Sequence, residues 1–110
     1  MAPGGDTTTD IDGNRKGDGI LGPTRFGLRF IFSYYQGTSM ATPHVSGVLG
    51  LMHLVNPNAS ARETRDYLLQ GADDAGAPGF DHLYGHGLLN AGEAVRRAAE
   101  LLREQLTIFV

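Results

Sequence analysis

Hydrophobic and polar positions divide the chain into a polar first part and a second part with helical spacing. Residues 1–25 are rich in Gly, Asp and Thr and have little periodicity, which predicts a loop. Aromatic and β-branched residues then gather at 26–35, which predicts one or two strands. Apolar residues cover most of the circumference of 39–55, which predicts a helix that is buried nearly all round.

Two further helices are predicted from their caps and their spacing. A helix over 60–70 begins with a capping box, because Ser60 can accept a hydrogen bond from the N–H of Glu63 while the Glu63 carboxylate reaches back. Asn90 is a suitable cap for a last helix over 91–106. That helix carries its apolar residues at helical spacing and its charges mainly on the opposite face, which is typical of packing on one side.

Composition excludes several classes of function. The 110 residues carry a net charge of −3 and no basic run beyond Arg96 and Arg97, so no nucleic-acid partner is expected. The absence of cysteine excludes disulfides, thiol catalysis and cysteine-based zinc sites. The longest mostly apolar run, 45–55, is too short and too interrupted to span a membrane, and the first residues lack the features of a signal peptide. We therefore expect no membrane partner.

Ser39 stands where a turn meets the predicted helix 39–55, a position that favours nucleophilic chemistry. Its own backbone N–H is one of the unsatisfied amides at the helix start, where the macrodipole favours negative charge. Gly37 allows a sharp turn and the close approach of a substrate backbone, and Pro43 falls in the first turn, where its missing N–H costs least. The alternative is that Thr38 or Ser39 serves only as an N-cap.

Three segments, in order, resemble one known family. The string GTSMATPHVSGVLGL at 37–51 resembles the nucleophile-serine signature of subtilisin-like serine proteases, the subtilases of the peptidase S8 type. APGGD at 2–6 resembles the segment that precedes that signature, and YGHGLLNAGEAV at 84–95 resembles the run that closes the catalytic domain. The resemblance identifies 1–106 as the C-terminal part of a subtilase catalytic domain, followed by an apolar tail at 107–110 of no assigned role.

The resemblance implies a fold, an activity and a location. The fold would be the three-layer α/β architecture with a mainly parallel sheet, in which 39–55 is the central buried helix. The activity would be that of a serine endopeptidase, acting on polypeptide substrates by acyl transfer through Ser39 with its own N–H as an oxyanion donor. Such a protein would be secreted or extracellular. Its substrate specificity is not encoded in this part of the domain.

The other members of the catalytic triad are expected outside this chain. In subtilases the Asp and the His both lie upstream of the serine, but no histidine precedes Ser39. His44 lies five residues further on, about 140° around and about 7.5 Å along a helix, so its ring should point away from Ser39. His53 is expected as a core or boundary residue, and His82 and His86 as loop residues.

The consequence expected for the isolated chain is low activity. A chain without its catalytic histidine would lose on the order of 10⁶-fold in turnover, as the same deletion does in subtilisin. We therefore expect a fragment that requires the upstream half of the catalytic domain and is nearly inert alone.

A calcium-binding loop remains open as an alternative function. Oxygen-rich loops can bind calcium, and the first loop holds such side chains at Asp6, Asp10, Asp12, Asn14 and Asp18. An EF-hand register counted from Asp12 places Lys16 where a ligand is required, which favours a solvated, turn-rich loop. We expect no required cofactor. A non-catalytic, subtilase-derived binding module is a further alternative.

Overall fold

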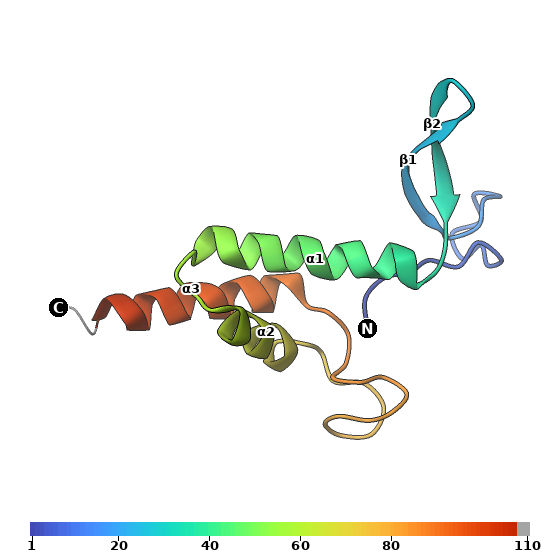
Figure 1. Cartoon of the computed structure of the whole chain (residues 1–110). Coiled ribbons are helices and arrows are strands. Elements are labelled where there is room, and N and C mark those ends of the chain that lie inside the picture. The colour runs from blue at the N-terminus through green and yellow to red at the C-terminus, as the bar shows by residue number, and fades with distance from the viewer. Residues whose placement is uncertain (108–110) are drawn as a thin grey trace. The chain divides into compact units, whose positions relative to one another are not determined.

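A computed structural model describes residues 1–107 of the chain (Figure 1). The chain forms two compact units, one of Ala2–His44 and one of Met1 with the residues from Val45 onward. The first unit contains a β-hairpin and the first turns of helix α1, Thr38–Val55. The second contains the rest of α1 with α2, Ala61–Gln70, and α3, Ala91–Thr107. The three helices lie within about a residue of the ranges predicted from the sequence.

The hairpin pairs β1, Ile20–Phe26, with β2, Arg29–Tyr35, in antiparallel register. Its two-residue turn has Gly27 at φ 60°, while Leu28 keeps a negative φ. Glycine at the first turn position with this φ is the type II′ arrangement, which matches the right-handed twist of paired strands.

The start of β1 differs from the sequence prediction, which assigned 1–25 to a loop. β1 begins at Ile20 because its backbone pairs with the aromatic strand β2, and this pairing overrides the weak strand preference of Gly22 and Pro23. Proline is tolerated because each strand of a two-stranded sheet is an edge strand. Before Ile20 the chain forms turns and one isolated bridge between Asp6 and Asp18.

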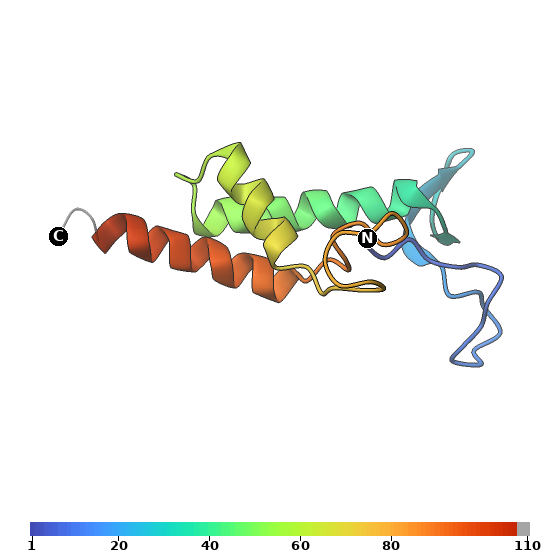
Figure 2. The same cartoon turned by 90° about the horizontal axis from the view of Figure 1, so that it is seen from below.

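The core of the second unit lies where the three helices meet. It is formed by Val48 and Met52 of α1, Leu68 of α2, and Ala94 and Ala98 of α3. Both views show α1 and α3 side by side (Figures 1 and 2). Because Ala94 is fully buried and short, the helices can pack closely there, and burial of the Met52 side chain stabilises the unit by roughly 1.5–3 kcal/mol.

Asn56, just after α1, is fully buried and links α1 to α3. Its amide nitrogen donates to the carbonyl of Ala98 at 3.4 Å and to Oε1 of Gln105 at 3.2 Å. Its side-chain oxygen accepts the backbone N–H of Asn58 at 3.2 Å. A buried amide is tolerated when its polar atoms are paired in this way.

Both predicted helix caps are confirmed. The Glu63 N–H donates to the Ser60 hydroxyl at 3.2 Å, and the Ser60 N–H donates to the Glu63 carboxylate at 2.8 Å. This return bond from the Ser60 backbone lowers the pKa of Glu63. The side-chain oxygen of Asn90 accepts the N–H of Glu93 at 2.9 Å and so caps α3.

The burial of α1 differs from the expectation of a helix buried nearly all round. Val48 and Met52 are buried, whereas Leu51 is 51% and Leu54 80% exposed. A helix becomes buried on every side only when layers cover each of its faces, and α2 and α3 supply one side.

The sheet and the tail also bear on the sequence predictions. Within residues 1–107 the sheet is the antiparallel hairpin, so the expected parallel strands are not among these residues. None of the described helices is long and apolar enough to cross a bilayer. Of the predicted tail at 107–110, Thr107 ends α3 and the other three positions lie outside the described residues.

Candidate active site

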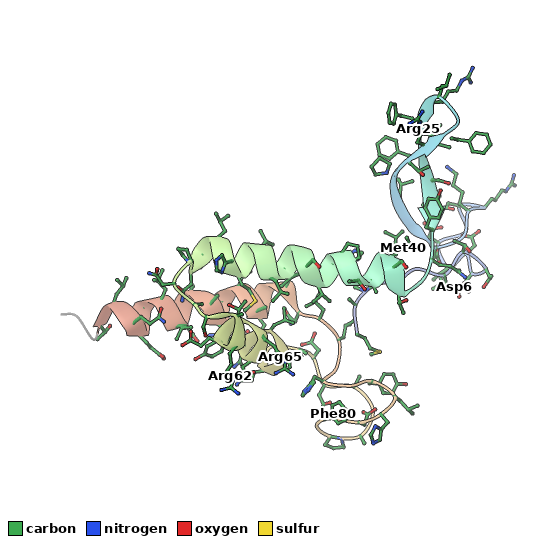
Figure 3. The ribbon with its side chains drawn as sticks, in the orientation of Figure 1. Asp6, Arg25, Met40, Arg62, Arg65 and Phe80 are labelled. Atoms are coloured by element: carbon green, nitrogen blue, oxygen red, sulfur yellow. The ribbon has the colours of Figure 1, made fainter. Side chains whose placement is uncertain are left out.

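Ser39 occupies the first turn of α1, directly after the hairpin, and is exposed. Gly37 makes the turn with a φ of 131°, a conformation that residues with side chains rarely adopt. The carbonyl of Gly37 accepts the N–H of Met40 at 3.0 Å and that of Ala41 at 3.2 Å. These bonds fix the backbone on both sides of Ser39. Figure 3 labels Met40 at this end of α1.

Gly4 packs directly against the turn that presents Ser39. The Gly37 N–H donates to the Gly4 carbonyl at 2.8 Å, and a Cβ at Gly4 would lie 3.0 Å from the Gly37 oxygen. Gly5, at φ 73°, lies so close to the hairpin that a Cβ would be 2.9 Å from the nitrogen of Ile20. Residues 2–6 were singled out only for their resemblance, and their contact with the serine turn was not predicted. The adjacent glycines were the available signal.

Gln36 is a second supporting residue that the sequence analysis missed. The backbone N–H and the hydroxyl of Thr7 both donate to Oε1 of Gln36, at 2.5 and 2.8 Å. Because Gln36 immediately precedes Gly37, these bonds attach the first loop to the serine turn. No local sequence pattern marks Gln36 for this role.

Two backbone amides at the start of α1 are free to bind an anion. The N–H groups of Thr38 and Ser39 precede the first hydrogen bonds of the helix and have no backbone acceptor among residues 1–107. The first turn contains no acidic residue. The positive end of the helix dipole is therefore not neutralised by the chain, which suits stabilisation of an oxyanion beside Ser39.

A groove with a volume of about 730 Å³ lies beside Ser39 within the first unit. One face of the hairpin and the first turns of α1 form its walls, which include Ile20, Pro23, Thr24, Tyr35, Met40 and Pro43. These side chains are mainly apolar, so the groove offers an apolar surface next to an exposed hydroxyl.

His44 borders the same groove, but it does not contact the Ser39 hydroxyl. Its Nδ1 is hydrogen-bonded to the carbonyl of Met40 at 2.8 Å. Ser39 and His44 thus line the same groove without a hydrogen bond between them, and the predicted direction of the His44 ring stays a prediction. Within residues 1–107 the Ser39 hydroxyl has no hydrogen-bond partner. No base is therefore hydrogen-bonded to Ser39 among the described residues.

The three remaining histidines lie in the other unit. His53 is exposed near the end of α1, which corrects its expected position at the core or its boundary. The reason is that Val48 and Met52 form the buried side of α1, and His53 does not lie on that side. His82 and His86 lie in the loop before α3, as predicted, and contact the ring of Phe80 at centroid distances of 5.7 and 5.1 Å (Figure 3).

The acidic first loop gathers part of the carboxylates singled out from the sequence. Single oxygens of Asp10, Asp12 and Asp18 lie within 4.8 Å of one another. All three carboxylates accept hydrogen bonds from the backbone of the loop: Arg15 donates to Asp10 at 2.9 Å, Asn14 to Asp12 at 3.0 Å and Ile11 to Asp18 at 2.8 Å. The loop therefore uses these acidic groups to hold its own turns.

Asp6 lies outside this acidic group. The hydroxyls of Thr8 and Thr9 donate to its carboxylate at 2.6 and 2.7 Å. The bond from the Thr8 hydroxyl is the main cause that lowers the pKa of Asp6 to about 2. These bonds fix the first turn of the loop.

An exposed serine at a helix start, with free amides beside it and an adjoining groove, is an arrangement that suits acyl-transfer chemistry. Comparison with known proteins agrees with this class. The model of the subtilase family matches residues 1–87, so the chain belongs to the subtilase family.

This chain matches only a short part of the length of each known relative described below. Fervidolysin of Fervidobacterium pennivorans is 42% identical over 65 residues, which cover 59% of this chain and 9% of fervidolysin. Subtilisin BL of Lederbergia lenta is also 42% identical over 65 residues, covering 59% of this chain and 23% of that protein. The chain thus corresponds to less than a quarter of either relative.

Solved structures give the same assignment. A protease from Pseudoalteromonas arctica PAMC 21717 aligns with a TM-score of 0.69 at 30% identity, over 87% of this chain and 28% of its own. Fervidolysin, described as a keratinolytic enzyme related to subtilisin, aligns with a TM-score of 0.60 at 33% identity, over 86% of this chain and 14% of its own. The helices and the hairpin therefore match part of the subtilase fold.

Proposed function

We propose that this chain carries the nucleophile of a serine endopeptidase, and that Ser39 is that nucleophile. The observation that carries the proposal is the placement of Ser39. It is exposed in the first turn of α1, next to two free backbone amides and a mainly apolar groove. Membership of the subtilase family supports a polypeptide substrate.

In the proposed reaction, the Ser39 oxygen forms a bond to the carbonyl carbon of a peptide. The carbonyl oxygen becomes an oxyanion, which the Ser39 N–H stabilises by a hydrogen bond at the start of α1. The C–N bond then breaks, and the amine leaves with the proton that the serine lost. Water afterwards hydrolyses the acyl ester and regenerates the hydroxyl.

The base that accepts the serine proton is proposed to come from residues outside these 110. Two observations support this: no histidine precedes Ser39, and no histidine among the described residues is hydrogen-bonded to the Ser39 hydroxyl. The small share of fervidolysin and Subtilisin BL that the chain covers is consistent with it. By this proposal the chain alone is nearly inert.

The same proposal extends to the fold of the complete domain, in which α1 would be central and covered by a mainly parallel sheet. The uncovered side of α1 supports it, because Leu51 and Leu54 are exposed there. A Cβ added at Gly47 or Gly50 would meet nothing within 4 Å, so this side has room for another layer. We also propose a secreted protein, by family likeness alone.

A chimeric protease tests the proposal. Residues 1–95 of this chain replace the matching segment of Subtilisin BL, which supplies the Asp and the His. We expect hydrolysis of casein that Ser39→Ala abolishes, while Ser33→Ala, in β2, serves as a matched control and leaves the rate within about threefold. A folded chimera that is inactive, or one that stays active after Ser39→Ala, would contradict the proposal.

The two alternatives from other classes predict different results. A non-catalytic binding module would yield a folded chimera without activity and an isolated chain that is a stable, soluble monomer. A calcium-binding loop domain would need the ion to fold. Differential scanning calorimetry of the isolated chain with and without calcium, with Asp12→Asn as the variant, separates this alternative, because a required ion would raise the unfolding midpoint.

A further inference from the structure

The tip of the hairpin exposes a group of large apolar side chains. The exposed fractions are 78% for Phe26, 91% for Leu28, 85% for Phe30 and 73% for Phe32. Apolar side chains grouped in this way on a surface mark an interaction site, whereas single exposed ones are normal. The group continues past the turn at Gly27, so it lies at the free end of the ribbon.

None of the side chains in this apolar group lines the groove beside Ser39. The register pairs Phe30 with Arg25, Phe32 with Pro23, and Tyr34 with Leu21. Alternate residues of a strand point to opposite faces, so Phe30, Phe32 and Tyr34 share one face. The other face carries Ile20, Thr24 and Tyr35, which line the groove, and Phe26, which lies next to the turn and does not line it.

The tip is basic as well as apolar. Arg25 and Arg29 flank the turn, and no Asp or Glu occurs between Asp18 and Glu63. The Nε of Arg25 donates to the carbonyl of Gly27 at 2.7 Å, which holds this guanidinium at the turn (Figure 3). At the other end of the same apolar face, the Nζ of Lys16 lies 5.8 Å from the centre of the Tyr34 ring.

The acidic first loop is too distant from the tip to cancel this charge. It joins the hairpin at the base of β1, where Asp18 precedes Ile20. A strand of seven residues extends roughly 20 Å at about 3.3 Å per residue. Exposed charges are largely screened beyond about 8 Å at physiological ionic strength. The tip therefore presents its arginines without the acidic loop.

We propose that the hairpin tip, residues 26–30 with Arg25, docks on an anionic lipid surface. Phe26, Leu28 and Phe30 would enter the boundary between headgroups and acyl chains, while the two arginines contact lipid phosphates. This docking lies at the interface and needs no spanning helix. It therefore departs from the expectation of no membrane partner, which rested on the absence of a spanning segment.

Charge favours a lipid surface over a second copy of the chain. Two hairpin tips brought together would oppose Arg25 and Arg29 to the same residues of the partner, which is unfavourable. An anionic bilayer offers the complementary charge and an apolar layer to the same small tip. The proposal is independent of Ser39, so Ser39→Ala should bind vesicles as the original chain does.

Vesicle co-sedimentation of the full 110-residue chain tests this docking. The vesicles are phosphatidylcholine alone or phosphatidylcholine with about a third phosphatidylserine. We expect binding to the anionic vesicles, weakened at least tenfold by Phe26→Ser with Leu28→Ser. Arg25→Gln with Arg29→Gln should weaken it roughly tenfold or more and remove the preference for anionic vesicles.

A matched control removes two equally exposed apolar side chains elsewhere. Leu54 and Leu83 are 80% and 85% exposed, so Leu54→Ser with Leu83→Ser should leave vesicle binding within about twofold. Equal losses in the tip and control variants would overturn the proposal, as would equal binding to neutral vesicles. Sedimentation velocity adds one outcome: tip variants that change self-association without any vesicle binding would indicate a protein partner instead.

Discussion

Nδ1 of His44 is hydrogen-bonded at 2.8 Å to the carbonyl oxygen of Met40, the residue four positions earlier and about one helical turn away. The histidine nearest to Ser39 in sequence is thus bonded to the helix backbone. This bond holds the His44 ring through Nδ1, and no hydrogen bond joins the ring to the Ser39 hydroxyl within residues 1–107. We therefore expect a structural role for His44.

Replacement of His44 should therefore leave catalysis nearly unchanged in the chimera described above. We expect His44→Gln to alter kcat by less than about threefold, because the glutamine side chain can still donate to the Met40 carbonyl. Kinetics on a chromogenic peptide measure this, with exposed His53→Gln as the control. A loss of several orders of magnitude in kcat for His44→Gln alone would show that this ring serves as the base.

Gly4 should tolerate a side chain poorly. A Cβ at Gly4 would lie 3.0 Å from the Gly37 oxygen, so Gly4→Ala should destabilise the first unit by roughly 1–3 kcal/mol. Gly22→Ala is the matched control, because a Cβ there meets nothing within 4 Å and should change the free energy of unfolding by less than about 0.5 kcal/mol. Urea unfolding followed by tyrosine fluorescence compares them. Equal effects would mean that the Gly4–Gly37 contact does not form.

Asn56 should contribute more to stability than its neighbour Asn58. Asn56→Ala removes the hydrogen bonds to Ala98 and Gln105 from a fully buried position, which should cost about 1–3 kcal/mol. Asn58 is exposed, so Asn58→Ala should lie within about 0.5 kcal/mol of the original chain. Chemical unfolding followed by circular dichroism at the helical band measures both. A smaller loss for Asn56→Ala than for Asn58→Ala would be inconsistent with the described link between α1 and α3.

Because of Glu93, the free energy of unfolding of the helical unit should change with pH in the acidic range. Hydrogen bonding to Arg96, at 2.6 and 2.9 Å, is the main cause that lowers the pKa of Glu93 from 4.5 to about 2. A lowered folded-state pKa adds stability above pH 4.5, and this contribution is lost as the pH falls from about 4.5 towards 2.

Glu93→Gln should flatten this pH dependence. The control is Glu104→Gln, which removes an exposed carboxylate of α3 that forms no ion pair within residues 1–107. Thermal unfolding between pH 2 and pH 6 gives the comparison. The interpretation fails if Glu93→Gln keeps the full slope between about pH 4.5 and pH 2.

Local features of this fold were predictable from the sequence, and contacts between distant segments were not. The Ser60 and Glu63 capping box joins residues three apart, so its geometry follows from helix formation alone. The contact of Gly4 with Gly37 depends on how the first loop folds back, which no local pattern encodes. The same limit explains why the start of β1 at Ile20 was missed, since it depends on pairing with β2.

In the candidate site, too, local features were predictable from the sequence and contacts between distant segments were not. The position of Ser39 in the first turn of α1 follows from Gly37, which local conformational preference makes recognisable. The face of α1 that is buried could not be predicted, because apolar residues surround the helix and only tertiary packing selects Val48 and Met52. Gln36 was missed because its role depends on Thr7, which reaches it only in the folded loop.

The most direct test of the central claim is the rate at which a fluorophosphonate probe labels Ser39 in the isolated chain, with the probe adduct located by peptide mass spectrometry. The claim is that a properly placed serine has no base among the residues of this chain. Labelling should be several orders of magnitude slower than in the chimera, where Subtilisin BL supplies the Asp and the His. Ser39→Ala should remove the chimera's signal. Rapid labelling of Ser39 in the isolated chain would contradict the claim.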